Sequence, residues 1–180
     1  MAGSSDKRGA LLINRAPVLT LWATVVAEQL GFEHDEALTL GRVVAGLNAY
    51  AKSVALGLFQ PTPPEVKEQR RRLRTEEVIA VDLLHRAVPA RQTPQGLRAL
   101  SKDRPVDPAS VERYLASKVG EQLAEVEEAL RTLARSVPVS ELASRGYVLY
   151  EAFRPEIPPG KKGWGAKGWL DLDRVREMAR

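Results

Sequence analysis

Apolar residues recur every three or four positions along much of this chain, which is the spacing of one face of an α-helix. The longest such run follows Asp107-Pro108, a strong helix start, and continues almost without interruption to Val137. Its apolar members are Val111, Leu115, Val119, Val126, Leu130, Leu133 and Val137. The run predicts one long helix, or two nearly collinear helices that meet at Gly120.

Shorter stretches predict helices on either side of this run. Asn14 is a good N-cap for a helix over about residues 15–30. Asp35 then places negative charge at the start of a second helix that reaches Leu56, where charge of that sign is favourable. Ser140 can cap a further helix. Because the second helix carries few charges, we expect it to be a central helix, packed on several sides or shared with a second subunit.

The sequence as a whole predicts a mainly α, bundle-like single domain of about five to seven helices. Residues 77–91 are ambiguous, since their β-branched side chains favour a strand whereas their leucines tolerate a helix. We assign them a small β-hairpin and expect at most that one strand pair. The expected organisation is a disordered arm over 1–13, a helical core domain over 14–154, and a Gly/Lys/Trp loop with a short C-terminal helix packed on that core over 155–180.

Composition limits the chemistry that the chain can perform. Its 180 residues include no cysteine and only two histidines, His34 and His85. Neither histidine has a cysteine or a second histidine at a ligand spacing, so we assign no metal site, no cofactor and no catalytic residue. Without cysteine no disulfide can form, and Met1–Ala10 does not read as a secretory signal. We therefore expect a cytoplasmic protein.

The second predicted helix carries a ladder of small residues at four-residue steps along one face. The ladder consists of Ala37, Gly41, Ala45 and Ala49. Small side chains let another helix approach closely, so a homodimer through Gly41, Ala45 and Ala49 is a candidate assembly. The same segment has the length of a membrane span, about 20 residues, but Arg42 and Lys52 would lie in the hydrocarbon without partners. No membrane partner is therefore expected.

A basic stripe follows the second helix. Between residues 65 and 75 the basic side chains lie three or four positions apart, so a helix would carry them on one side. They are Lys67, Arg70, Arg71 and Arg74. The stripe predicts contact with an anion or a nucleic acid. The alternative is a solvated helix face, which Glu65, Glu68 and Glu76 would partly neutralise.

A second candidate site lies near the C-terminus, where glycine, lysine and tryptophan are concentrated. Its residues are Lys161, Lys162, Trp164, Lys167 and Trp169. Glycines let backbone N–H groups approach an anion, lysines add charge, and tryptophan rings can stack on bases. In the alternative interpretation the tryptophans close the end of the helical core. Asp171 or Asp173 is expected to cap a last short helix that runs through Met178.

The glycines of this segment have the spacing of a dinucleotide-binding turn, but a Pro-Pro-Gly turn precedes them instead of a strand. We therefore expect no nicotinamide or flavin cofactor. The leading hypothesis is a cytoplasmic binding module that contacts nucleic acid, or another polyanion, through both basic segments without strong sequence preference. It requires these two segments to converge on one surface. The alternatives are a structural or regulatory homodimeric interaction protein without a ligand, and a cysteine- and metal-independent enzyme of unknown substrate.

Overall fold

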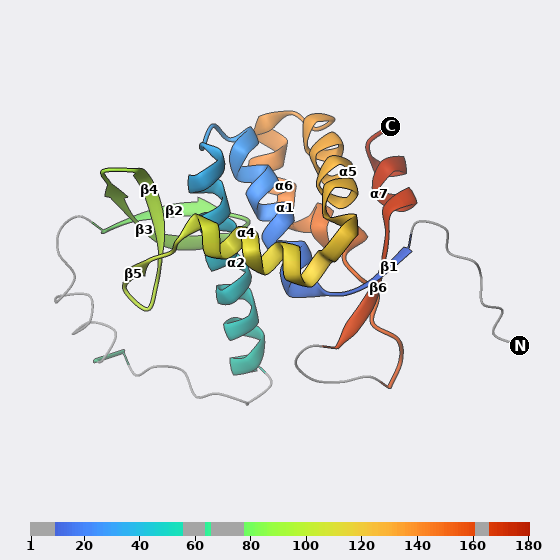
Figure 1. Cartoon of the computed structure of the whole chain (residues 1–180), viewed down its shortest axis with the longest axis horizontal. Coiled ribbons are helices and arrows are strands. Elements are labelled where there is room, and N and C mark those ends of the chain that lie inside the picture. Colours follow the sequence, from blue (N-terminus) through green and yellow to red (C-terminus); the bar gives the residue numbers. More distant parts are fainter. Residues whose placement is uncertain (1–9, 56–63, 66–77, 161–165) are drawn as a thin grey trace, which may run out of the picture.

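The structure, a computed structural model, describes residues 10–55, 64–65, 78–160 and 166–180 (Figure 1). Of these residues 60% are helical and 23% lie in strands, which form a two-stranded and a four-stranded antiparallel sheet. The protein therefore has an α+β fold. The predicted mainly α bundle with at most a small hairpin is wrong, because four strands assemble where only one hairpin was expected.

The described helices are α1 (Arg15–Gln29), α2 (His34–Ala55), α4 (Pro108–Val119), α5 (Leu123–Arg135), α6 (Val139–Phe153) and α7 (Leu172–Met178). The strands are β1 (Ala10–Asn14), β2 (Val78–Leu83), β3 (Arg86–Thr93), β4 (Gly96–Ser101), β5 (Arg104–Pro105) and β6 (Lys167–Asp171). The predicted helix over about 15–30 is confirmed as α1, and the one that begins near Asp35 as α2. The predicted cap of the last helix is also confirmed, since the Asp171 carboxylate accepts the N–H groups of Asp173 and Arg174.

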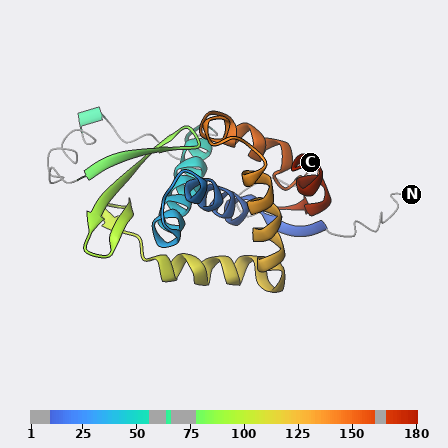
Figure 2. The same cartoon turned by 90° about the horizontal axis from the view of Figure 1, so that it is seen from above.

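Helix α1 lies at the centre of the fold, and the second predicted helix, α2, packs on several sides as expected, against α1, α4, β3 and β4. Every residue from Pro17 to Ala27 is buried, and Figure 2 shows α1 enclosed by the other helices. The sequence carries the reason, because no charged residue lies between Arg15 and Glu28. A helix that is uncharged on all sides can be buried on all sides. The indole N–H of Trp22 donates to the Gly146 carbonyl at 2.8 Å, which satisfies its one polar atom in this core.

Helix α1 of the same chain packs against the small residues of α2. Ala37, Gly41 and Ala45 are buried, and a Cβ atom at position 41 would lie 2.6 Å from the Thr20 carbonyl oxygen of α1. The close approach that the ladder predicted therefore exists, but it is intramolecular at these three positions.

The four-stranded sheet has the order β2-β3-β4-β5. Strands β2 and β3 form the hairpin expected over 77–91, and its two turn residues, Leu84 and His85, have φ values of 50° and 63°. Helix α2 closes the free edge of β4, because Glu36 accepts the Leu97 N–H at 2.8 Å and Thr39 accepts the Ala99 N–H at 3.0 Å. Two helix side chains thus take the place of a neighbouring strand.

Strand β1 pairs with β6 from the other end of the chain, with Leu12 opposite Trp169. Residues 10–13 were expected to belong to a disordered arm, yet Ile13 is buried in the core. Gly168 of β6 lies so close to Glu156 that a Cβ atom there would be 2.7 Å from its carbonyl oxygen. The pairing of β1 with β6 therefore joins segments that are far apart in the sequence, and local sequence patterns do not reveal it.

Helices α4 and α5 are not collinear. Gly120 has a φ of 74°, which glycine adopts without strain, and the chain changes direction sharply there (Figures 1 and 2). In the part of the chain that the structure describes, no helix combines the length and the apolarity that crossing a membrane requires.

Candidate functional site

Most of the basic residues singled out in the sequence lie outside the described residues. These are Lys67, Arg70, Arg71, Arg74, Lys161 and Lys162, and the candidate stacking residue Trp164 also lies outside the described residues. Lys167 and Trp169 are described, and both are exposed on one face of β6. Strand β2 directly follows the first basic segment and β6 the second. The sheets that contain these strands lie at opposite ends of the molecule with the helices between them (Figures 1 and 2), which gives no support to a common surface.

The surroundings of Trp169 are mixed in charge. Its side chain is 40% exposed beside Leu12, and its backbone exchanges hydrogen bonds with Glu156. Because cross-strand partners point to the same face, Glu156 lies beside the indole. Lys167 and Asp171 lie two positions away along the strand, on that same face. Two carboxylates near one ammonium do not make a surface that attracts phosphate.

A more positive site lies where α1 begins and α6 ends. Tyr147, Tyr150 and Arg154 lie along one side of α6, at spacings of three and four residues. The Tyr150 hydroxyl donates to the Arg15 carbonyl at 3.4 Å, and the Arg15 Nε donates to the Pro155 carbonyl at 2.8 Å. We call Arg15, Tyr147, Tyr150 and Arg154 the arginine–tyrosine cluster.

Among the residues that the structure describes, this cluster has no counterion. Burial and the nearby Arg154 lower the pKa of Arg15 from its ordinary value, but a guanidinium keeps its charge at neutral pH. The other groups that act on Arg15 are Tyr150 and Tyr147, and no carboxylate among the described residues does so. Burial raises the pKa of Tyr150, so its hydroxyl is neutral at pH 7. Two cations therefore share a partly buried site with no negative partner among the described residues.

Polar contacts continue from this cluster to the four-stranded sheet. The Asn48 amide donates to the Tyr147 hydroxyl at 3.3 Å, and Arg86 donates to the Asn48 carbonyl oxygen at 2.9 Å. Asn48 belongs to α2 and Arg86 begins β3, so three elements meet here. The sequence did not indicate that Arg15, Asn48, Arg86 and Arg154 lie near these tyrosines. They are dispersed from position 15 to 154 and no local motif connects them.

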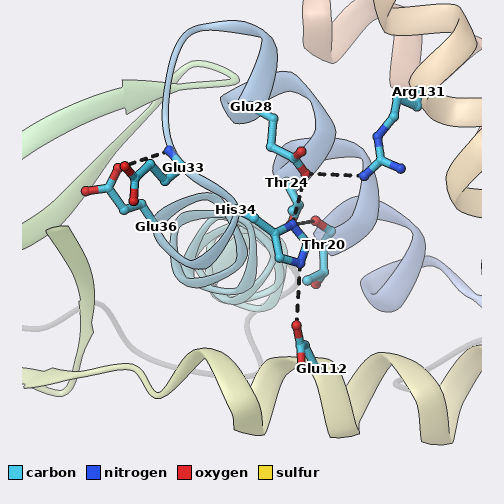
Figure 3. Close-up of polar contacts among 8 residues, drawn as sticks. All are labelled: Thr20, Thr24, Glu28, Glu33, His34, Glu36, Glu112 and Arg131. Carbon is cyan, nitrogen blue, oxygen red and sulfur yellow. Dashed lines mark hydrogen bonds and ion pairs between the residues drawn. The ribbon is translucent and has the colours of Figure 1, made fainter. Parts of the chain in front are cut away.

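A second polar cluster surrounds His34 at the start of α2 (Figure 3). Its ring lies between Glu28 of α1 and Glu112 of α4. The two hydroxyls drawn nearby offer no nucleophile, because Thr20 and Thr24 are buried and donate to carbonyls within α1. Among the described residues no group of three side chains is arranged to hold a metal ion. The cluster can therefore link helices electrostatically.

No family model, no curated protein and no solved structure matches this chain.

Proposed function

We propose that this protein is a cytoplasmic binding module for nucleic acid or a similar polyanion, and that the arginine–tyrosine cluster is its principal contact. The observation that supports this proposal is that Arg15 and Arg154 lie near each other. No carboxylate is among the described groups that act on Arg15. Two guanidinium groups that have no counterion among the described residues repel each other, and a phosphate that binds both removes that repulsion.

The groups of the cluster suit a phosphodiester chain. Arg15 uses Nε for the Pro155 carbonyl, and its terminal nitrogens have no partner among the described residues. Arginine binds phosphate oxygens through such parallel N–H groups. Tyr147 is half-buried and contacts the ring of Tyr150, with 5.8 Å between ring centroids. The face of an aromatic ring such as this can stack on a base without regard to the base's identity.

The basic residues predicted from the sequence have a supporting role in this proposal. Lys67, Arg70, Arg71 and Arg74, and the lysines of the C-terminal segment, add positive charge that attracts a polyanion over distance. Trp169 is a weaker candidate for stacking than Tyr147, because Glu156 and Asp171 lie beside it. The homodimer through Gly41, Ala45 and Ala49 is not proposed again, because α1 covers Gly41 and Ala45.

Binding of labelled single- and double-stranded DNA and RNA, followed by fluorescence anisotropy, tests the proposal. We expect affinity to fall steeply between about 50 and 200 mM salt, because bound phosphates release counterions. Arg154→Glu should weaken binding about tenfold or more, which corresponds to about 1.4 kcal/mol. Arg70→Glu combined with Arg71→Glu should reduce the salt dependence.

Arg145→Glu is the matched control. Arg145 is exposed on α6 and precedes Arg154 by about two and a half helical turns, which places it on the opposite side of the helix. Both substitutions change the charge equally, so both lose the same long-range attraction. Equal losses of affinity in Arg154→Glu and Arg145→Glu would show that the cluster is not the contact. Affinity weaker than about millimolar at low salt, or independent of salt, would refute the binding function itself.

A further inference from the structure

A chain of hydrogen bonds leads from Arg86 through Asn48 to Tyr147. Arg86 begins β3, Asn48 lies in α2 and Tyr147 lies in α6, so the chain joins three elements. The Arg86 Nη2 donates to the Asn48 Oδ1 at 2.9 Å, and the Asn48 Nδ2 donates to the Tyr147 hydroxyl at 3.3 Å. All three side chains are partly buried. We call Arg86, Asn48 and Tyr147 the relay.

The direction of the relay follows from its first member. A guanidinium has N–H donors and no acceptor, so the atom of the Asn48 amide that faces Arg86 has to be the oxygen. The NH2 group of Asn48 then faces Tyr147 and can only donate, which makes the phenolic oxygen of Tyr147 the acceptor. The hydroxyl proton of Tyr147 therefore points away from Asn48.

This proton has no acceptor among the residues that the structure describes. The one side-chain hydrogen bond that Tyr147 makes with them is the bond that it accepts from Asn48. The neighbouring Tyr150 differs, because its hydroxyl donates to the Arg15 carbonyl. Tyr147 lies close enough to Arg15 to act on its charge, and its ring centroid is 5.8 Å from that of Tyr150. The free O–H of Tyr147 thus belongs to the arginine–tyrosine cluster.

The relay also makes the Tyr147 O–H group a stronger donor. Arg86 keeps its positive charge at neutral pH. Hydrogen bonds that follow one another in a chain polarise each other, so a cation at the start draws electron density from the phenolic oxygen at the end. A hydroxyl polarised in this way forms its strongest hydrogen bond with an acceptor that carries negative charge.

We propose that Tyr147 donates its hydroxyl proton to a non-bridging phosphate oxygen of the ligand, and that Asn48 and Arg86 are positioning residues that hold the hydroxyl in this role. The inference rests on the proposed binding of a polyanion at the arginine–tyrosine cluster. The non-bridging oxygens of a phosphodiester only accept hydrogen bonds. One of them can therefore receive the Tyr147 proton while another pairs with Arg15 or Arg154.

Tyr147→Phe tests the contact, because it removes the hydroxyl and keeps the ring that packs against Tyr150. Its affinity for a labelled single-stranded oligonucleotide should be about tenfold weaker, as expected for a lost hydrogen bond to a charged group. The slope of affinity against salt should remain that of the wild type, because a neutral hydroxyl releases no counterion. Tyr114→Phe is the matched control and should bind as the wild type does. Tyr114 is also half-buried, but it lies on α4, where Arg42 covers its ring.

Asn48→Asp tests the direction of the relay. A carboxylate accepts hydrogen bonds from both Arg86 and Tyr147, so it should draw the Tyr147 proton away from the ligand. Its negative charge weakens binding as well, and that part of the loss should persist in the Tyr147→Phe background. The loss of affinity caused by Asn48→Asp should therefore be about threefold larger, or more, in the wild type than in Tyr147→Phe.

Three results would overturn this inference and leave the binding function intact. They are an affinity of Tyr147→Phe equal to that of the wild type or of Tyr114→Phe, a changed salt slope in Tyr147→Phe, and equal losses for Asn48→Asp in both backgrounds. A wild type that binds no oligonucleotide at low salt would instead refute the proposed function, and the inference with it.

Discussion

Gly41 of α2 packs directly against Thr24 of α1, so a Cβ atom at position 41 would overlap the Thr24 hydroxyl and lie 2.9 Å from its backbone nitrogen. Neither helix can yield easily, because the obstructing atoms include backbone atoms of the buried central helix. Gly41→Ala is therefore expected to lower the free energy of unfolding by about 1–3 kcal/mol, measured by urea denaturation.

Gly46→Ala is the control for this substitution. Gly46 lies in the same helix, but it is exposed and nothing approaches its missing Cβ within 4 Å. Alanine there should stabilise the protein by about 0.5–1 kcal/mol, because it has the higher helix propensity. Opposite signs for the two glycines are the expected result. The same sign for both would show that close packing does not govern position 41.

The Thr39 hydroxyl is expected to contribute to stability by accepting the Ala99 N–H of β4. Both residues are buried, so Thr39→Val leaves that N–H without a partner, at a cost of about 1–3 kcal/mol. Thr20→Val is a suitable comparison, since the equally buried Thr20 hydroxyl only donates to a carbonyl of its own helix. Calorimetric unfolding should show the larger loss for Thr39→Val. A smaller loss at position 39 would argue against the closure of β4 by α2.

The β2–β3 turn holds a non-glycine residue in a left-handed conformation, since His85 is exposed and has a φ of 63°. Such a residue costs about 1 kcal/mol or more relative to glycine. His85→Gly is therefore expected to stabilise the protein by about 0.5–1 kcal/mol after the entropy of the unfolded chain is subtracted. His85→Ala retains a Cβ atom and should bring no such gain. Thermal denaturation of both variants distinguishes relief of backbone strain from loss of the imidazole.

Tyr150 should make the protein sensitive to alkali. Burial raises the pKa of its hydroxyl in the folded state, whereas an unfolded tyrosine titrates near pH 10. Above about pH 10 the unfolded chain therefore releases this proton first, and stability is lost as the pH rises, by up to about 1.4 kcal/mol for each pH unit. Below that pH the contribution is fully present.

Tyr150→Phe should reduce this alkaline loss, measured by denaturation between about pH 9 and 11. Part of the loss should remain, because burial also raises the pKa of Tyr114. Tyr50→Phe is the control for the loss of an exposed hydroxyl, since Tyr50 is 42% exposed. An identical slope in the wild type and Tyr150→Phe would contradict the buried state of this hydroxyl.

Local signals predicted the helices well and the strands poorly. The Asp107-Pro108 start of α4 and the Asp171 cap of α7 were found because a helix satisfies its own hydrogen bonds and is capped by its own neighbours. A strand cannot satisfy its own backbone hydrogen bonds and needs a neighbouring strand. Ala10–Asn14 forms β1 only because β6, more than 150 positions along the chain, supplies its hydrogen bonds.

The candidate site also could not be predicted from local sequence signals. Arginine and tyrosine are common residues, and nothing in the segments around Arg15, Tyr147 and Arg154 indicates that they meet. Their proximity results from the packing of α6 against α1, in which Trp22 and Phe153 contact each other edge to face at 5.3 Å. Strands β2 and β6, which follow the two basic segments in the sequence, belong to sheets at opposite ends of the molecule (Figures 1 and 2).

The sequence by itself determined where several helices begin, such as α4 after Asp107 and α7 after Asp171, and the apolar stretch that becomes the buried α1, because helix spacing and capping act over a few residues. The tertiary structure alone decided that the ladder of small residues at Gly41 and Ala45 serves α1, that helix side chains close the edge of β4, and that Arg15 and Arg154 share one site. These are contacts between distant segments, and their energies depend on a geometry that arises only when the whole core packs together.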